Sequence, residues 1–410
     1  MAELDQDQDD MIDQNDELTE KENKNEPLIS FAKLNKYFLI PLSYPIFFFI
    51  SSILDETIAE NNVFKNPELI ITIIYDVSII LAGLFYFISY FRPKKNVKKE
   101  SNNNEEKSNT DITYIYNENL PTKYKAYKII LLILLLAFMY SIDDLYWIFF
   151  GENRVFEERL FYLFFIPLFS KVILKENIYK HHYFSLLISI IGIIFLIIPV
   201  CLVFQTEDII PNILNFVKGI IYPLFLVIIK YLVEKYYLST LKICLLIGII
   251  SLIINLIGYT IYSLIKDDFS LFTDCFNFSA ENKLEISIFF ILFFLFATLT
   301  QLALYLSIFY FSPTLIMVTS IISPLLKWIY DSATKGEELT DLILNSIGYL
   351  ILLFSSLIYN ELIILNCCDL NKNTKKFVNK RLYEELEDIK KSEEIYLPAA
   401  DNNSLMAGNN

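Results

Sequence analysis

Ile166-Pro167-Leu168-Phe169-Ser170-Lys171 and Ile322-Ser323-Pro324-Leu325-Leu326-Lys327 are two apolar stretches that align at a constant shift of 156 residues. The same shift places Gly192 on Gly348, each inside a further apolar run. A helix pair therefore occurs twice in the chain. This internal repeat predicts a fold made of two similar halves.

The amino-acid composition indicates the broad class of protein. Hydrophobic residues make up 54% of the 410 residues, with 35 Phe and 27 Tyr, more than a water-soluble globule could easily bury. We therefore expect an integral membrane protein. The net charge of −14 gathers in the tails, because residues 1–26 hold eleven acidic residues and two lysines. This acidic head is polar and lacks periodicity, so we expect it to be disordered.

Ten apolar runs are each long enough to cross about 30 Å of hydrocarbon as a helix. The predicted fold class is an all-α integral membrane protein whose ten transmembrane helices form two inverted five-helix repeats. The expected spans lie near 37–54, 68–91, 127–147, 157–174, 183–205, 213–233, 240–265, 286–309, 312–331 and 343–366. The domain boundaries that follow are a cytosolic head at 1–35, a first repeat at 36–205 with a basic cytosolic loop at 92–126, a second repeat at 206–366 and a charged cytosolic tail at 367–410.

The distribution of basic residues predicts the orientation. One side of the predicted spans carries 22 Lys and Arg residues and the other carries six. Since basic residues concentrate on the cytosolic side, both termini should be cytosolic and the two repeats should face opposite ways. The same orientation places the sequon Asn277-Phe278-Ser279 in a non-cytosolic loop, which predicts N-glycosylation at Asn277.

The hairpin Phe169-Ser170-Lys171-Val172-Ile173-Leu174-Lys175-Glu176, followed by Gly192 in an aliphatic run, is similar to the drug/metabolite transporter superfamily (EamA-like). The resemblance covers residues 37–366. The last hairpin, from Gly348 to Tyr359-Asn360-Glu361-Leu362-Ile363, resembles orphan members of solute carrier family 35. This resemblance implies a secondary transporter that moves a small organic solute by alternating access through a cavity between the two halves. A nucleotide-sugar or other phosphorylated-metabolite exchanger of the same fold is an alternative.

Ionisable side chains inside the membrane are the first candidates for a site, because they are costly to bury. Asp76 lies within the second span and is too short to reach the interface. It predicts a proton-coupling or cation-binding carboxylate; alternatively, Tyr75, Ser78 or a neighbouring backbone satisfies it. Asp143 and Asp144 lie near the outer end of the third span and could form an acidic vestibule with Asp76; alternatively, the pair is simply solvated.

Three further polar residues are substrate-binding candidates. Lys218 in the sixth span could pair with an acidic group or receive an anionic substrate, or else extend to the membrane interface. The amides of Asn255 and Gln301 could hydrogen-bond a solute, or instead join helices.

The remaining motifs concern lipid modification, metal binding and the membrane in which the protein resides. Cys367 and Cys368 follow the last span and are candidates for palmitoylation. The adjacent His181 and His182 lack further ligands at suitable spacing, so we expect a solvated pair rather than a metal site. Weak sorting motifs at Glu26-Pro27-Leu28-Ile29 and Tyr383-Glu384-Glu385-Leu386 favour an endomembrane (Golgi, endosomal or lysosomal/vacuolar) over the plasma membrane.

Enzymatic activity is not expected, because the chain has no glycine-rich phosphate loop and no nucleophile placed beside a base. No cofactor is expected either. The expected partners are the lipid bilayer and a small-molecule solute, with proton coupling and a homodimer as open possibilities, and without nucleic acid. A different class of function also stays open: a non-transporting membrane adaptor whose charged tails recruit other proteins.

Overall fold

A computed structural model describes twelve segments of the chain. These are residues 29–31, 39–60, 67–91, 122–150, 158–202, 209–266, 283–311, 313–336, 338–366, 370–374, 377–378 and 380–381. The described residues form two compact units. Those that fall within 1–34, 178–187 and 357–410 belong to the first unit, and those that fall within 35–177 and 188–356 belong to the second.

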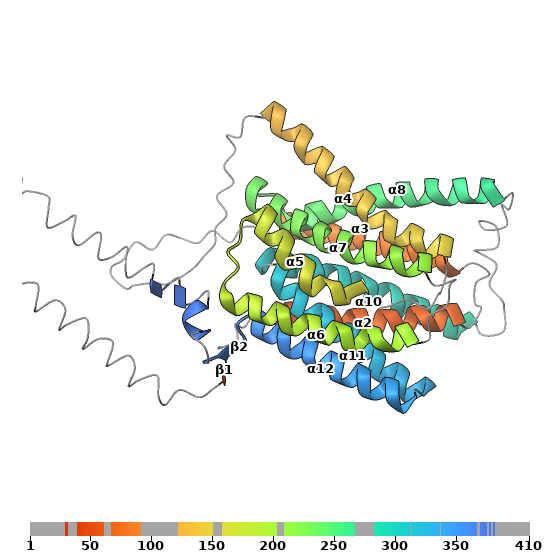
Figure 1. Cartoon of the computed structure of the whole chain (residues 1–410). Coiled ribbons are helices and arrows are strands. Elements are labelled where there is room, and N and C mark those ends of the chain that lie inside the picture. The colour runs from red at the N-terminus through yellow and green to blue at the C-terminus, as the bar shows by residue number, and fades with distance from the viewer. Residues whose placement is uncertain are drawn as a thin grey trace, which may run out of the picture. The chain divides into compact units, whose positions relative to one another are not determined.

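Ten α-helices occur in the described segments, one in each run that the sequence predicted as a span (Figure 1). Seven of the described helices are long and apolar enough to cross a membrane, and α3 and α4 contain shorter apolar segments, Leu69–Phe85 and Ala126–Ile142. This supports a multi-pass helical membrane protein. The helices are α2 (Leu39–Glu60), α3 (Pro67–Phe91), α4 (Thr122–Phe150), α5 (Tyr162–Phe169), α6 (Lys180–Leu202), α7 (Ile209–Tyr236), α8 (Thr240–Lys266), α10 (Lys283–Tyr310), α11 (Pro313–Lys335) and α12 (Leu339–Tyr359).

The fourth predicted span is not one regular helix. It consists of the 3₁₀ turn η2 (Glu158–Phe161), the short helix α5 and the π-helical turn η3 (Ser170–Leu174). Pro167 lies inside α5 and has no N–H to give to the preceding turn, which favours the change of helical pitch that follows. Lys175 then ends the segment in the left-handed conformation, with φ of 59°.

The tenth span ends earlier than predicted. The structure ends α12 at Tyr359, whereas the apolar run continues to residue 366. Glu361 takes a φ of 56°, and the N–H of Leu362 bonds back to the carbonyl of Leu357 at 3.0 Å, which closes the helix. Residues Ile363–Leu365 then form strand β2, which pairs antiparallel with β1 (Ile29–Phe31). A β-branched apolar run suits a strand as well as a helix, so hydropathy alone could not locate this boundary.

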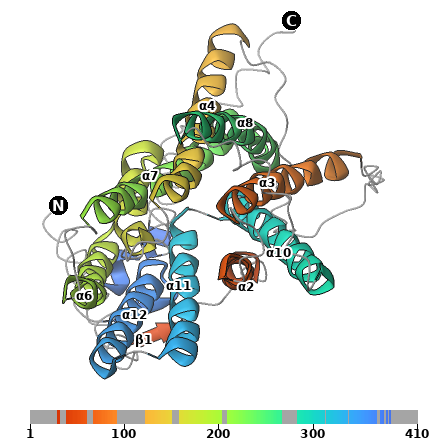
Figure 2. The same ribbon diagram turned by 90° about the vertical axis from the view of Figure 1, so that its right-hand side faces the viewer.

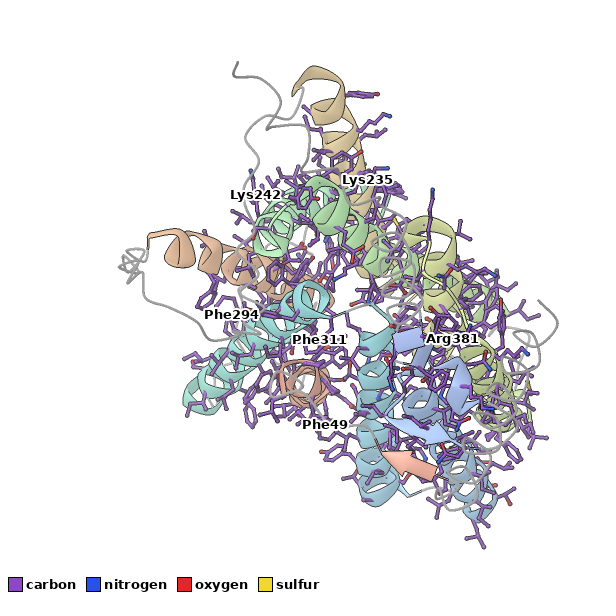
Figure 3. The ribbon with its side chains drawn as sticks, turned by 90° about the vertical axis from the view of Figure 1, so that its left-hand side faces the viewer. Phe49, Lys235, Lys242, Phe294, Phe311 and Arg381 are labelled. Atoms are coloured by element: carbon purple, nitrogen blue, oxygen red, sulfur yellow. The ribbon has the colours of Figure 1, made fainter. Side chains whose placement is uncertain are left out.

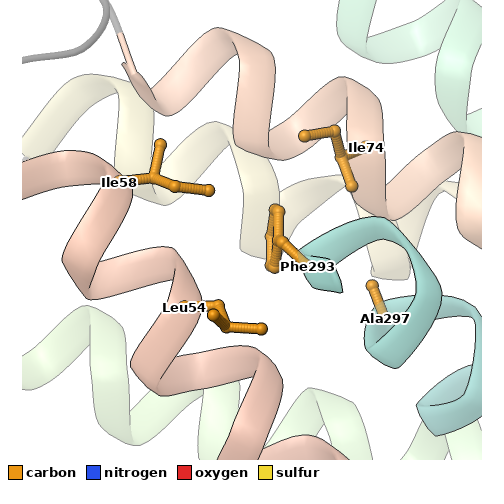
Figure 4. Packing of buried hydrophobic residues seen from close by; sticks show 5 residues of the cluster. All are labelled: Leu54, Ile58, Ile74, Phe293 and Ala297. Atoms are coloured by element: carbon orange, nitrogen blue, oxygen red, sulfur yellow. The ribbon is translucent and has the colours of Figure 1, made fainter. Parts of the chain in front are cut away.

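Helices α2, α3 and α10 of the second unit share an apolar core. Leu54 and Ile58 of α2 meet Ile74 of α3 and Phe293 and Ala297 of α10, and all five side chains are buried (Figure 4). Ala297 is small and lets the three helices approach closely, and the Phe293 ring packs between α2 and α3.

The second half of α2 also contacts α11. The rings of Phe49 and Tyr330 meet edge to face with their centroids 6.3 Å apart; Phe49 is labelled in Figure 3. Glu56 accepts a hydrogen bond from Lys335, and its other oxygen lies 3.8 Å from Nζ of Lys327. Ion pairs therefore join the C-terminal turns of these two helices.

Helices α6 and α12 lie side by side in two perpendicular views (Figures 1 and 2) and cross at two glycines. A Cβ atom on Gly348 would lie 2.6 Å from Cγ of Leu196 and 3.1 Å from the carbonyl oxygen of Gly192. A Cβ atom on Gly192 would lie 2.9 Å from Leu352 and 3.1 Å from the carbonyl oxygen of Gly348. The contact is thus reciprocal, and only glycine allows the two backbones to come this close.

Candidate functional site

Asp76 lies where α3 packs antiparallel against α8, and its side chain has no exposed surface. The hydroxyl of Ser251 donates to one carboxylate oxygen, and Nδ2 of Asn255 donates to the other at 2.9 Å. We call Asp76, Ser251 and Asn255 the acidic cluster. Two of the predicted candidates, Asp76 and Asn255, are therefore in direct contact. The donors come from α8, one helical turn apart, rather than from α3 itself.

Close approach of the two helices is what brings the donors within reach. A Cβ atom on Gly248 would lie 2.9 Å from Ile79, and one on Gly83 would lie 2.6 Å from the Leu245 backbone. On the far side of Asp76, the hydroxyl of Tyr259 lies 3.5 Å from Oγ1 of Thr72. The acidic cluster thus occupies the middle of a tight, partly polar helix interface.

The acidic cluster can hold a carboxyl group in either protonation state. Both hydrogen-bond partners of Asp76, Ser251 and Asn255, are neutral. When Asp76 is protonated, neither partner is therefore left as an unpaired charge. The carboxylate in turn is met by two donors, which favour the charged form. A group held in this way can accept and release a proton, or it can simply join two helices.

A second set of charged residues lies at η2. The Arg159 guanidinium donates from Nη1 to the Ser323 hydroxyl at 3.2 Å, and its Cζ lies 3.8 Å above the ring centre of Phe48. Nε lies 4.0 Å from a Glu158 carboxylate oxygen, and the Arg159 side chain is only 17% exposed. α2, η2 and α11 thus each supply a group to one largely enclosed guanidinium.

Glu158 also faces α7. Its carboxylate interacts electrostatically with Lys218 and accepts a hydrogen bond from the side chain of Asn215. A Cβ atom on Gly219 would lie 3.1 Å from the Glu158 carbonyl oxygen, so α7 lies directly against η2. We call Arg159, Glu158, Lys218, Phe48 and Ser323 the arginine cluster.

Tyrosines surround the arginine cluster. Tyr222 is hydrogen-bonded to Tyr44 and interacts electrostatically with Arg159 and Tyr305. Its ring stacks on Tyr162, with centroids 5.1 Å apart and 13° between the ring planes. The arginine cluster therefore holds two cations and one anion beside polar aromatic rings, and groups of these kinds can bind a small organic molecule.

The other predicted site residues have different outcomes. Lys218 is 7% exposed and interacts electrostatically with Glu158, so its side chain lies inside the bundle rather than at its surface. Gln301 is buried on α10. Asp143 and Asp144 lie in α4, but their side chains are outside the part that the structure describes. Outside it as well are the predicted glycosylation site Asn277 and the predicted palmitoylation sites Cys367 and Cys368.

The expectation of a solvated histidine pair is wrong, because both side chains are buried in the first unit. Nε2 of His181 lies 2.8 Å from the carbonyl oxygen of Ile358, which can only accept, so the ring nitrogen donates. Nδ1 of His182 accepts the N–H of Tyr179 at 3.1 Å, and its Nε2 lies 3.8 Å from Glu361. The turn after α12 therefore covers the two histidines. Among the described residues, no group of three or more His, Cys, Asp or Glu could hold a metal ion.

Sequence reasoning missed Glu158 and Arg159. It counted Arg159 among the basic residues that set orientation. A signal was present, because Glu157-Glu158-Arg159 directly precedes an apolar run that contains a proline. Charged residues so close to a span can enter the bundle when the first turn is not a regular α-helix, as η2 shows.

No family model matches this chain, and no curated protein matches its sequence.

Proposed function

We propose that this protein is a secondary transporter of a small organic solute that works by alternating access. The observation that carries the proposal is the arginine cluster. It joins residues of the first half of the chain, Phe48 and Arg159, to residues of the second half, Lys218 and Ser323. Charged groups placed between the two halves of the chain are what a transporter needs in order to bind a solute within the membrane.

The glycine crossing supports a twofold repeat. The shift that aligns Gly192 with Gly348 also aligns Leu196 with Leu352. Each glycine faces the leucine that follows its counterpart by one turn. Reciprocal contacts between equivalent residues are what a local twofold axis between two inverted five-helix repeats would produce. We propose this arrangement for residues 36–205 and 206–366, with both termini in the cytosol.

The acidic cluster suggests how transport could be driven. Asp76 is fully buried among apolar helices and is held by two neutral donors, so protonation changes its charge without breaking the contact between α3 and α8. We propose Asp76 as the proton-coupling group. The resemblance to the drug/metabolite transporter superfamily agrees with this function. The cations of the arginine cluster favour, as a second candidate, an exchanger of phosphorylated metabolites within the same fold.

The test is uptake by full-length protein in proteoliposomes, using a panel of radiolabelled amino acids, carboxylates, phosphorylated sugars, nucleotide sugars and organic cations. Wild type should take up at least one solute above empty vesicles. Arg159→Gln should lower that uptake by about tenfold or more, because a charge-assisted contact is lost. The matched control is Arg381→Gln, an exposed arginine of the first unit (Figure 3), which should change uptake by less than about twofold.

A pH gradient tests coupling in the same vesicles. The gradient should accelerate uptake by wild type, and Asp76→Asn should remove this acceleration while uptake without a gradient continues. Wild-type protein that stays at background for every solute in the panel would refute the transport proposal. An Asp76→Asn variant that still responds to the gradient would refute coupling alone.

A further inference from the structure

We propose that the C-terminal parts of α2 and α11 form a gate that closes the solute path at its non-cytosolic end, with Glu56 of α2 held between Lys327 and Lys335 of α11. We call these three residues the latch. This inference rests on the proposed transport function and on the proposed cytosolic termini, and it adds how access to the arginine cluster is regulated. With both termini in the cytosol, α2 and α11 are the first and ninth spans, so both end on the non-cytosolic side.

The latch lies beyond the arginine cluster along both helices. Phe48 of α2 and Ser323 of α11 each contact Arg159. At about 1.5 Å of rise per residue, Glu56 lies about 12 Å farther along α2 than Phe48. By the same rise, Lys335 lies about 18 Å farther along α11 than Ser323. Since α2 and α11 meet again at the latch, their contact closes the space between these two helices on that side of the arginine cluster.

The latch consists of charges on facing sides of the two helices. Lys327, Asp331 and Lys335 follow one another at intervals of four residues, so they share one face of α11. One oxygen of Glu56 accepts a hydrogen bond from Lys335, and the other lies 3.8 Å from Nζ of Lys327. Nζ of Lys335 also lies 3.5 Å from a carboxylate oxygen of Asp331. Lys335 therefore keeps an acidic partner on its own helix when α2 moves away, which lowers the cost of opening.

An aromatic contact adds to the latch on the side nearer the arginine cluster. Phe49 precedes Glu56 by seven residues and so lies on the same face of α2. Its ring meets that of Tyr330 edge to face, with centroids 6.3 Å apart. One ring pair and a few ion pairs therefore hold α2 to α11 at this end.

The contacts of α2 with α3 and α10 are of a different kind. Leu54 and Ile58 are buried among apolar side chains of those two helices, and separating them would lose close packing throughout that core. In the latch, by contrast, the side chains of Lys327 and Lys335 are 43% and 55% exposed. Water already reaches these charges, so parting them costs little. Figure 2 shows α2 between α10 and α11; opening should part α2 from α11 and leave it on α10.

Each of the two helices contains a proline at which bending can start. Pro45 lies inside α2, four residues before Phe49, and Pro324 lies inside α11, three residues before Lys327. A proline within a helix lacks the N–H for the backbone hydrogen bond, and its ring crowds the preceding turn, so helices bend there. The latch thus lies beyond the bending point of both helices. Residues 46–60 and 325–335 can tilt apart while the earlier turns keep their contacts.

A static brace is the competing explanation, in which the latch only fastens α2 to α11. The two explanations differ in what happens at the arginine cluster. Altering the charges of a brace leaves the access of water to Ser323 unchanged, whereas altering a gate changes it. Ser323 is only 3% exposed, so a cysteine at this position reports opening.

The test is the rate at which a charged methanethiosulfonate reagent labels Ser323→Cys in full-length protein in lipid nanodiscs, with the five native cysteines replaced by serine. Glu56→Gln should raise the rate by about two- to fivefold, as expected for the loss of exposed ion pairs. Glu56→Lys should raise it by about tenfold or more, because three lysines then repel one another. Adding Lys335→Glu to Glu56→Lys should lower the rate again by about threefold or more. The matched control is Glu234→Lys, which alters an exposed ion pair within α7 and should change the rate by less than about twofold.

A cross-link tests the gate in the opposite direction. In proteoliposomes, oxidising Phe49→Cys/Tyr330→Cys to a disulfide should lower solute uptake by about tenfold or more, and dithiothreitol should restore it to within about twofold. The matched control is Phe47→Cys/Phe296→Cys, which replaces a ring pair between α2 and α10 with centroids 6.1 Å apart. Those helices stay together, so the control disulfide should change uptake by less than about threefold.

Three results would overturn the inference. The first is Glu56→Lys protein in which Ser323→Cys is labelled at the unaltered rate, which would leave the latch as a brace. The second is a charge-reversed double variant that labels as fast as Glu56→Lys, which would show that the charges do not hold the gate. The third is a Phe49→Cys/Tyr330→Cys disulfide that leaves uptake unchanged, which would reject the gate while leaving the transport proposal intact. Labelling needs no solute, so a failure of the transport proposal remains distinguishable from a failure of the gate.

Discussion

Replacing Gly348 with alanine should destabilise the second unit through a clash that the structure locates. The added Cβ would lie 2.6 Å from Cγ and 2.7 Å from Cδ2 of Leu196, and 3.1 Å from the carbonyl oxygen of Gly192. Carbon atoms in contact normally lie about 3.5–4.0 Å apart, so the helices must separate by about 1 Å or Leu196 must leave its position. Overpacking of this kind costs about 1–3 kcal/mol. The higher helix propensity of alanine returns up to about 1 kcal/mol, so a mid-range overpacking cost of about 2 kcal/mol leaves a net loss of about 1–2 kcal/mol.

The measurement is the free energy of unfolding in mixed micelles, followed by circular dichroism, for Gly348→Ala, Leu196→Ala and the double variant. Leu196 is buried, so Leu196→Ala alone should also destabilise, by about 2–3 kcal/mol. In the double variant the new methyl group occupies space that Leu196 has vacated. The decrease in the free energy of unfolding of the double variant should therefore be smaller, by at least about 1 kcal/mol, than the sum of the decreases of the two single variants. Two results would refute the close packing of Leu196 on Gly348: decreases in stability that simply add in the double variant, or a Gly348→Ala protein as stable as wild type.

Three further outcomes follow from the described contacts. Asp76→Ala should lower the free energy of unfolding by roughly 2–3 kcal/mol and Asp76→Asn by roughly 1 kcal/mol, because the amide keeps one of the two hydrogen bonds; equal losses in thermal unfolding would contradict this. Glu56→Gln should cost at most about 1 kcal/mol, and the difference should shrink in about 1 M NaCl, because the side chain of Lys335 is 55% exposed; a Tm difference unaffected by salt would argue against the ion pair. His182→Ala should speed hydrogen exchange of the Tyr179 amide by about tenfold, whereas His182→Asn should not if its side-chain oxygen replaces Nδ1.

Hydropathy was sufficient to find the helices of this chain and insufficient to find their ends. A run of apolar residues about twenty long leaves few alternatives to a helix, so each of the ten predicted runs contains one. The same signal extended the last helix through Ile363–Leu365, which instead forms β2. That outcome depends on pairing with Ile29–Phe31, more than 300 residues away, and a local sequence window does not contain it.

The candidate site was predictable where a single residue carried the signal. Asp76 stood out because a short carboxylate cannot reach water from within an apolar helix. Its contact with Asn255 could not be foreseen, since it depends on which face of α8 meets α3. Arg159 was overlooked because its role arises from Phe48 and Ser323, which are far from it in sequence. Burial of the histidine pair likewise depends on the turn after α12.

The crossing of α6 and α12 has a mechanical consequence. At the crossing, each glycine meets the leucine that follows its counterpart by one turn, and neither glycine has a side chain of its own to lock the two helices at one angle. Helices α6 and α12 can therefore change the angle between them by pivoting at Gly192 and Gly348, while the crossing point keeps its position. If access alternates, spin labels at Leu202 and Leu342 should change their separation, while labels close to the two glycines should keep theirs.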